Sequence, residues 1–175
     1  MIDKPGRQPP RFPASKELVA AQKITEALQK LGAGPEDLAL MQGACGGDLL
    51  FTEVCQQRGT QLQWLQPFDE PTFIQKSVVR HSETWRDRYL KAKAKLTTTI
   101  RSAPESLGPS PKGIDPYERC NLWLLYTALS YGISKVQFVC LWDGGGGDGP
   151  GGTAHMYQEV NRRTGHVTWI DSRTL

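Results

Sequence analysis

Two glycine-rich segments contain the residues of this chain that are best placed to do chemistry. Residues 43–48 read Gly-Ala-Cys-Gly-Gly-Asp, and residues 144–155 hold four consecutive glycines followed by Asp-Gly-Pro-Gly-Gly-Thr-Ala-His. Glycine lets backbone N–H groups approach an anion that a Cβ would hold away. Where such a loop begins a helix, unpaired N–H groups and the helix dipole both favour a phosphate. The two segments therefore predict recognition of a phosphate-bearing small molecule, such as a nucleotide or a nucleotide derivative.

Each glycine segment follows a predicted strand and precedes a predicted helix. Apolar runs over residues 38–41 and 136–141 indicate buried strands, and apolar periodicity over residues 49–58 and 156–163 indicates helices. Ligands of open parallel sheets bind outside the carboxyl ends of the strands. We therefore expect both loops and both helix N-termini to open on one crevice at that rim.

The remaining elements complete an alternating pattern. Further helices are predicted over residues 15–31, with Ser15 as the N-cap, and over residues 70–79, 83–96 and 117–131, with Tyr126 facing inward; further strands are predicted over residues 62–65, 97–100 and 167–170. Prolines predict an extended segment over residues 1–14 and a surface loop over residues 102–116. The pattern favours a single α/β domain over residues 1–175, a Rossmann-like three-layer sandwich with a mainly parallel sheet.

The predicted order begins with a loop and a helix, without a strand ahead of them. Doubly wound folds open on a strand whose following loop helps to line the site, and residues 1–13 have the character of such a loop. Two interpretations stay open: the sheet lacks one edge, or the chain is a piece of a longer protein whose first strand lies upstream. An unpaired sheet edge would favour a homodimer.

Composition restricts the class of protein. The chain has 175 residues, a net charge of +3 and an apolar fraction of 38%, values typical of a globular domain. No apolar run is long enough for a bilayer, no signal peptide begins the chain, and the basic residues are not interleaved with aromatic ones. We therefore expect a cytoplasmic protein without membrane or nucleic-acid partners.

The four cysteines argue against a metal site. None forms a CxxC pair or stands at zinc-ligand spacing from histidine, and three lie in apolar segments, which indicates reduced, buried thiols. Cys45 differs because it stands in a glycine loop, where its reactivity is worth testing. We expect neither a metal nor a cofactor.

Several polar side chains are candidates for roles at the rim. His155 is a candidate general base, and Glu159 lies about one turn beyond it on the same predicted helix face, although an ordinary structural role stays open for both. Asp48 and Thr153 are either helix caps or ligand contacts. Phosphate charge would be neutralised by arginine and lysine, with surface solvation as the alternative. The candidates are Arg7, Arg11 and Lys76.

Neither loop matches a well-known nucleotide motif, since GxxxxGK[ST] and GxGxxG with a following acid are both absent. Together, however, the loops resemble those of the SLOG superfamily, the Rossmann-like group that includes the LOG phosphoribohydrolases and the Smf/DprA domains. The likeness rests on residues 44–48 and 149–153, and it extends over most of the chain through residues such as Met1, Trp85 and Asn121. More closely, the chain is similar to an uncharacterised bacterial domain found beside tetratricopeptide, TIR or nucleotide cyclase modules.

The resemblance implies a sensor of nucleotide-derived signals in bacterial stress or antiviral defence, acting through a fused or separate effector. The enzymatic branch carries Pro-Gly-Gly-x-Gly-Thr followed by glutamate, whereas residues 150–155 read Pro-Gly-Gly-Thr-Ala-His, which argues against phosphoribohydrolase activity. Residues expected at the ligand are Gly43, Cys45, Gly46, Gly47, Asp48, Asp143, Gly149, Gly151, Gly152, Thr153, His155, Arg7, Arg11, Lys76 and Ser77.

Three functions stay open at this point. The first is a nucleotide-binding sensor module. The second is a small nucleotide-processing enzyme, an N-glycosidase, phosphoribohydrolase or deoxyribosyltransferase-like protein, in which a rim carboxylate acts with His155. The third is an assembly module whose glycine loops are only structural.

Overall fold

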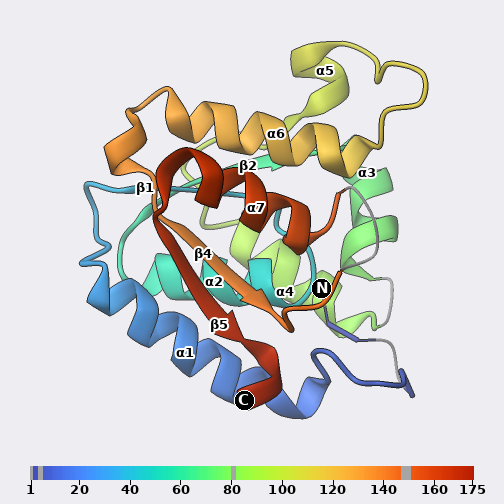
Figure 1. Ribbon diagram of the computed structural model, residues 1–175. Coiled ribbons are helices and arrows are strands. Elements are labelled where there is room, and N and C mark those ends of the chain that lie inside the picture. The colour runs from blue at the N-terminus through green and yellow to red at the C-terminus, as the bar shows by residue number, and fades with distance from the viewer. Residues whose placement is uncertain (1, 4–5, 80–81, 147–150) are drawn as a thin grey trace.

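The computed structural model describes residues 2–3, 6–79, 82–146 and 151–175. These residues form a Rossmann-like α/β sandwich of helices packed on parallel strands, as the sequence predicts. In Figure 1, α6 and α7 lie on one side of the strands, and α1 and α2 lie on the other. The strands of both sheets point the same way, so their carboxyl ends share one side of the molecule.

The first half of the chain follows the prediction closely. A 3-10 turn, η1 (Ala14–Lys16), leads into the first helix, so that Lys16 rather than Ser15 occupies the N-cap position. The helix buries Ala20, Ile24, Ala27 and Leu28 at the spacing of one apolar face. The elements in this half are α1 (Glu17–Lys30), β1 (Leu38–Met41), α2 (Gly47–Gln57), β2 (Gln61–Gln66), α3 (Glu70–Phe73), the π-helical turn η2 (Ile74–Val78) and α4 (Thr84–Lys93).

The second half contains two departures from the prediction. The third strand is not residues 97–100 but β3 (Arg101–Ser102), because the hydroxyl of Thr98 donates to the Leu62 carbonyl and replaces a backbone ladder bond there. The expected loop over residues 102–116 contains a short helix, α5 (Ala103–Leu107). The remaining elements are α6 (Pro116–Leu129), η3 (Ile133–Lys135), β4 (Phe138–Trp142), α7 (Thr153–Thr164), β5 (Val167–Asp171) and η4 (Ser172–Thr174).

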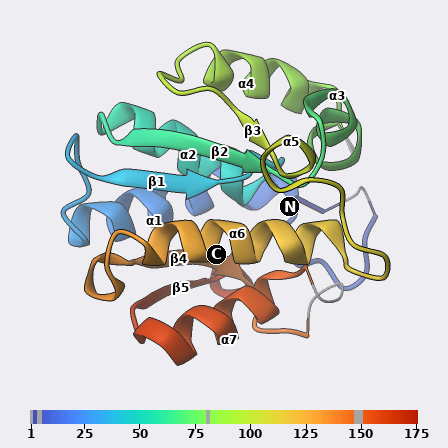
Figure 2. The same ribbon diagram turned by 90° about the horizontal axis from the view of Figure 1, so that it is seen from above.

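Parallel pairing divides the described strands into two sheets. The larger sheet has the order β1-β2-β3, with Met41 opposite Trp64 and Leu65 opposite Arg101. The smaller sheet pairs β4 with β5, and Phe138 lies opposite Val167. Seen from above in Figure 2, α6 lies over the strands, with the larger sheet on one side of it and the β4-β5 pair on the other. The sequence predicts parallel pairing correctly, but not the division into two sheets.

An aromatic core lies beneath the larger sheet. Trp64 and Tyr89 are fully buried, with ring centroids 4.9 Å apart, and Phe73 packs against Tyr89. At the edge of this core, the Arg88 guanidinium of α4 donates to Glu53 of α2 at 2.6 and 2.9 Å and to Glu17 of α1. These two carboxylates hold the pKa of Arg88 above its usual range, with hydrogen bonding to Glu53 as the largest cause. The ion pairs fasten the helices of one face together.

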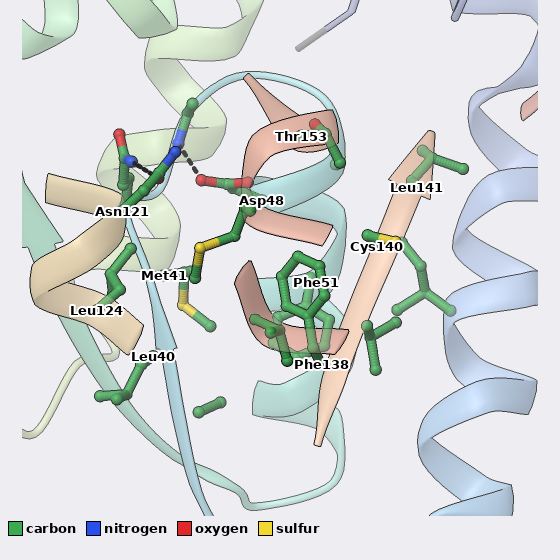
Figure 3. A pocket seen from close by; sticks show the side chains of 18 of the residues that line it. Leu40, Met41, Asp48, Phe51, Asn121, Leu124, Phe138, Cys140, Leu141 and Thr153 are labelled. Atoms are coloured by element: carbon green, nitrogen blue, oxygen red, sulfur yellow. Dashed lines mark hydrogen bonds between the residues drawn. The ribbon is translucent and has the colours of Figure 1, made fainter. Parts of the chain in front are cut away.

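Tyr126 of α6 does not face inward as predicted. The helix buries Cys120, Leu124 and Leu125, whereas Tyr126 is 55% exposed. The apolar residues surround much of this helix, so that periodicity alone does not fix which side faces the strands. The observed orientation turns Leu124 and the polar Asn121 toward β1 (Figure 3).

Gly43, just after β1, stands where both the backbone conformation and the neighbouring Trp64 ring require glycine. Gly43 has a φ of +86°, and a Cβ there would lie 3.0 Å from the Trp64 ring, which has no room to move. We expect Gly43→Ala to lower the free energy of unfolding by about 1–2 kcal/mol for the left-handed backbone and by a further 1–3 kcal/mol or so for the overlap. Gly32→Ala is the matched control, since φ is +71° and nothing lies within 4 Å. Urea denaturation with equal losses for the two variants would contradict the role of Trp64.

Candidate functional site

The first glycine loop, residues 43–46, joins the carboxyl end of β1 to α2. The Asp48 carboxylate turns back and accepts hydrogen bonds from the N–H groups of Gly43 and Ala44 at 3.2 and 3.3 Å. The N–H of Cys45 donates to the Ser77 carbonyl at 2.9 Å. The first three N–H groups of the loop are therefore used within the protein, and Asp48 fixes the loop instead of capping the helix.

The N-terminus of α2 is open. Its N-cap is Gly46, at a φ of +87°, and no side chain caps the helix. Within the described part of the chain, the N–H groups of Gly46, Gly47 and Asp48 have no acceptor. A Cβ on Gly47 would meet only the Leu141 side chain at 3.9 Å, so this end of the helix faces open space. Unpaired N–H groups of this kind are what an anion binds.

The second glycine loop packs tightly onto α6 where it approaches α7. A Cβ on Gly151 would lie 2.5 Å from the Cβ of Tyr117 and 2.8 Å from an Asp115 oxygen, so only glycine fits. The Gly151 carbonyl accepts a hydrogen bond from Asn121 at 2.8 Å, and the Asn121 oxygen accepts one from Gln42 at 2.8 Å. This chain of hydrogen bonds ties the second loop to the end of β1. Gly149 lies outside the described residues.

Helix α7 begins in the same open manner as α2. Gly152 is its N-cap, no side chain caps it, and Thr153 is its first residue. Among the residues that the structure describes, the N–H groups of Thr153 and Ala154 have no acceptor. By contrast, the N-terminus of α6 at this rim is closed, because the Asp115 carboxylate accepts from the N–H groups of Tyr117 and Glu118. Two of these three helix ends are thus free to meet a ligand.

Both loops open on one cavity of about 1170 Å³. Figure 3 shows Asp48 and Thr153 together at the end of the cavity where β1 ends at Met41 and β4 nears its end at Leu141. The crevice expected from the sequence is present, and both open helix N-termini reach it. Expected site residues that line it are Arg7, Arg11, Gly47, Asp48, Asp143, Gly151, Gly152 and Thr153.

Charges of both signs surround the rim of the cavity. Asp3 accepts from the N–H groups of Arg11 and Phe12 at 2.7 and 2.6 Å, which ties the two ends of the N-terminal segment together. The Arg7 guanidinium lies 3.6 Å from Asp3, and that of Arg11 lies 3.9 Å from Asp143. Both arginines line the cavity, so they bring positive charge to its rim.

Besides Gly46, the N-cap of α2, and His155, the lining of the cavity lacks four more of the expected residues that the structure describes. Cys45 is buried, with 1% of its surface exposed, and does not line the cavity. Ser77 is fully buried, and its hydroxyl hydrogen-bonds that of Tyr117 at 2.9 Å. The Lys76 ammonium lies 4.4 Å from the centre of the Phe68 ring, a cation–π contact away from the cavity. Gly43 supports its loop against Trp64 and does not line the cavity.

The expected pair of His155 and Glu159 is not formed. His155 turns toward α6, where its Nε2 lies 3.9 Å from Glu118, and its buried Nδ1 has no partner in the described chain. Glu159 accepts hydrogen bonds from Arg162 and Arg163, and hydrogen bonding to Arg163 is the largest cause that lowers its pKa. Neither side chain lines the cavity. The helix spacing brings the two residues to one side, but Glu159 pairs with arginines of its own helix, whereas His155 turns toward Glu118 of α6.

Sequence reasoning missed Gln42, Asn121 and Tyr117 as residues of the site. Gln42 and Asn121 form the hydrogen-bonded link between the loops, and Tyr117 places an aromatic ring at the rim. One signal was available in the sequence, since Asn121 is a lone amide within a strongly apolar helix. A buried amide in such a place needs partners, and loop backbones are the usual ones.

The described residues offer little to a metal ion or a membrane. They contain no group of three or more His, Cys, Asp or Glu side chains placed to hold a metal. None of their helices is long and apolar enough to cross a bilayer.

Comparisons with family models, curated proteins and solved structures gave no significant match.

The link between the loops can be tested by removing Asn121. Asn121→Ala leaves the Gln42 amide and the Gly151 carbonyl unpaired, and we expect the free energy of unfolding to fall by about 1–3 kcal/mol. Asn161→Ala, on the exposed face of α7, is the matched control and should change stability by less than about 0.5 kcal/mol. Equal effects in chemical denaturation would show that the link does not stabilise the site.

Because its cysteines are buried, we expect the protein to become less stable at alkaline pH. Burial raises the pKa of Cys55 and of Cys140 from 9.0 to about 12, and it raises that of Cys120 as well. Above pH 9 the unfolded thiols ionise while the folded ones stay neutral, so the free energy of unfolding should fall as pH rises from 9 to 11. Removing two of these thiols in C55A/C140A should make this decline shallower. An unchanged slope in urea titrations at several pH values would refute the prediction.

Proposed function

We propose that this protein binds a nucleotide or a nucleotide-derived molecule at the rim where α2 and α7 begin. The observation that carries the proposal is the meeting of two uncapped helix N-termini at one cavity, beside two arginines. Each helix N-terminus offers N–H donors and the positive end of a dipole. Two such ends suit a ligand with more than one phosphate group, such as a diphosphate.

Aromatic and cationic groups near the two helix ends support a ligand larger than inorganic phosphate. Tyr117 lines the cavity beside the second loop, and its ring is held edge-on to Phe68 with centroids 5.3 Å apart. A fixed ring of this kind is suited to stacking on a nucleobase. Arg7 and Arg11 line the same rim and would neutralise phosphate charge.

The geometry favours binding over cleavage. The two carboxylates that line the rim beside the loops, Asp48 and Asp143, both accept hydrogen bonds from loop N–H groups, and His155 lies outside the cavity. A carboxylate that accepts hydrogen bonds from the loop backbone is committed to holding the loop. We propose further that the protein is a sensor of the SLOG-like group, which its two loops resemble, and a cytoplasmic module of bacterial stress or antiviral signalling that acts through an effector.

A ligand panel tests the proposal. The protein would be incubated with mono-, di- and cyclic nucleotides and with ADP-ribose derivatives, while thermal shift reports binding and chromatography reports products. Binding without turnover supports the sensor. Turnover would instead identify a nucleotide-processing enzyme, and the absence of both would leave an assembly role and overturn the proposal.

Two variants connect binding to the rim. Gly47→Val places a branched side chain over the open N–H groups of α2 and should abolish binding, while the fold survives because only Leu141 is near. Gly34→Val, in the loop before β1, is the matched control. Arg11→Gln should weaken binding by about tenfold or more, whereas Arg162→Gln, whose side chain is 66% exposed on α7, should not. Full affinity in Gly47→Val would place the ligand elsewhere.

A further inference from the structure

Strands β1 and β4 are neighbours that do not pair. Each has a hydrogen-bonded partner on one side only, β2 for β1 and β5 for β4. The two strands point the same way, as Figures 1 and 2 show, and their free edges border the same cavity. The free edges of the two sheets thus run parallel and border a gap inside the molecule.

The gap extends along the whole length of both strands. Its lining runs from Asp37 and Lys135 before the strands to Gln42 and Asp143 after them. Between these ends the walls are apolar, with Leu40 and Met41 on one side, Phe138 and Cys140 on the other, and Phe51 of α2 between them in Figure 3. Helices enclose the gap, since Ile24 and Leu28 of α1, Leu124 of α6 and Val160 of α7 also line it. We refer to this apolar part of the cavity as the slot.

An empty slot of this kind is not a stable arrangement. Protein interiors are packed as densely as organic crystals, and voids much larger than a water molecule are few. Buried N–H and C=O groups are nearly always paired, and a free strand edge is a template for another strand. The slot combines both conditions, because it is apolar on two faces and bordered on its other two sides by backbone donors and acceptors.

The order of the elements indicates what fits. A doubly wound sheet starts at its centre and winds outward in both directions, and each parallel crossover carries a helix. Here β1, β2 and β3 step away from the slot on one side, and β4 and β5 step away on the other. Every strand pair has its crossover helix, yet α1 precedes β1 without a strand to cross from. The slot is the central position from which that crossover would start.

We propose that a further parallel strand, joined to the chain directly ahead of residue 1, occupies the slot and pairs with both β1 and β4. Ile2 is buried, with 5% of its surface exposed, and lines the cavity together with Asp3. Asp3 is held close to the carboxyl end of β4, since its carboxylate accepts from the N–H of Arg11 and the Arg11 side chain reaches Asp143. A segment that ran through the slot in the direction of β1 would emerge at this place.

The length and composition of the strand follow from the slot. At about 3.3 Å per residue, about five residues span the length of β4. Helices cover both faces, so the strand is apolar throughout and rich in β-branched residues, as in other buried parallel strands. It joins the two sheets into one. The proposal does not depend on the identity of any ligand at the rim.

The experiment adds the strand. The protein would be extended ahead of residue 1 by about five alternating valines and isoleucines, and a control extension would carry proline at the central position, which removes a ladder donor. Amide hydrogen exchange is measured at Ala39, Leu40 and Met41 and at Val139, Cys140 and Leu141. We expect exchange at these amides to slow by about tenfold or more with the apolar extension, and not with the proline control.

A second measurement reports on the slot itself. The 175-residue chain should bind an apolar dye such as anilinonaphthalene sulfonate, and the apolar extension should displace the dye. Equal protection by the proline control, or no change in exchange with either extension, would overturn the proposal. So would protection of these amides in the 175-residue chain to the level of β2, since that result means that β1 and β4 pair directly. None of these measurements involves a nucleotide, so a failure here is distinct from a failure to bind one.

Discussion

The hydrogen bonds of Asn121 are the interaction on which the site depends. The two sheets share no backbone ladder, and the Asn121 side chain reaches from α6 to Gln42 at the end of β1 and to Gly151 in the second loop. Through this amide, and through the packing of Gly151 against Tyr117, the start of α7 is set opposite the start of α2. The relative position of the two open helix ends is therefore decided by α6, a helix whose own N-terminus is closed by Asp115.

The N–H groups at the rim fall into two sets, those paired within the protein and those left without an acceptor in the described chain. Asp48 and Ser77 satisfy the N–H groups of residues 43–45, and the groups that follow are left for α2 to present. The carboxylate of Asp143 does the same for Gly145 in the second loop. Carboxylates that faced an anionic ligand would repel it, but here they accept hydrogen bonds from the loop backbone. Arg11 lies 3.9 Å from Asp143, Arg7 lies 3.6 Å from Asp3, and the two arginines supply compensating positive charge.

The slot and the rim belong to one cavity but differ in polarity. At the rim, polar groups converge and water competes with any ligand. In the slot, apolar side chains from four helices and two strands surround free backbone edges, and an extended polypeptide is the occupant that satisfies both surfaces at once. A central strand would also carry Ile2 and Asp3 to the rim, so the two regions are linked through the first residues of the chain.

The sequence by itself determined the α/β class, the parallel pairing, most helices and strands, and the two glycine loops at strand ends, because apolar periodicity and glycine act locally. Only the tertiary structure decided which side chains meet. His155 and Glu159 share a helix face, yet Glu118, Arg162 and Arg163 draw them apart, and Cys45 and Ser77 are buried by packing across elements. The face of α6, the place of Asn121 and the slot between β1 and β4 depend on contacts between residues far apart in the chain, which periodicity does not encode.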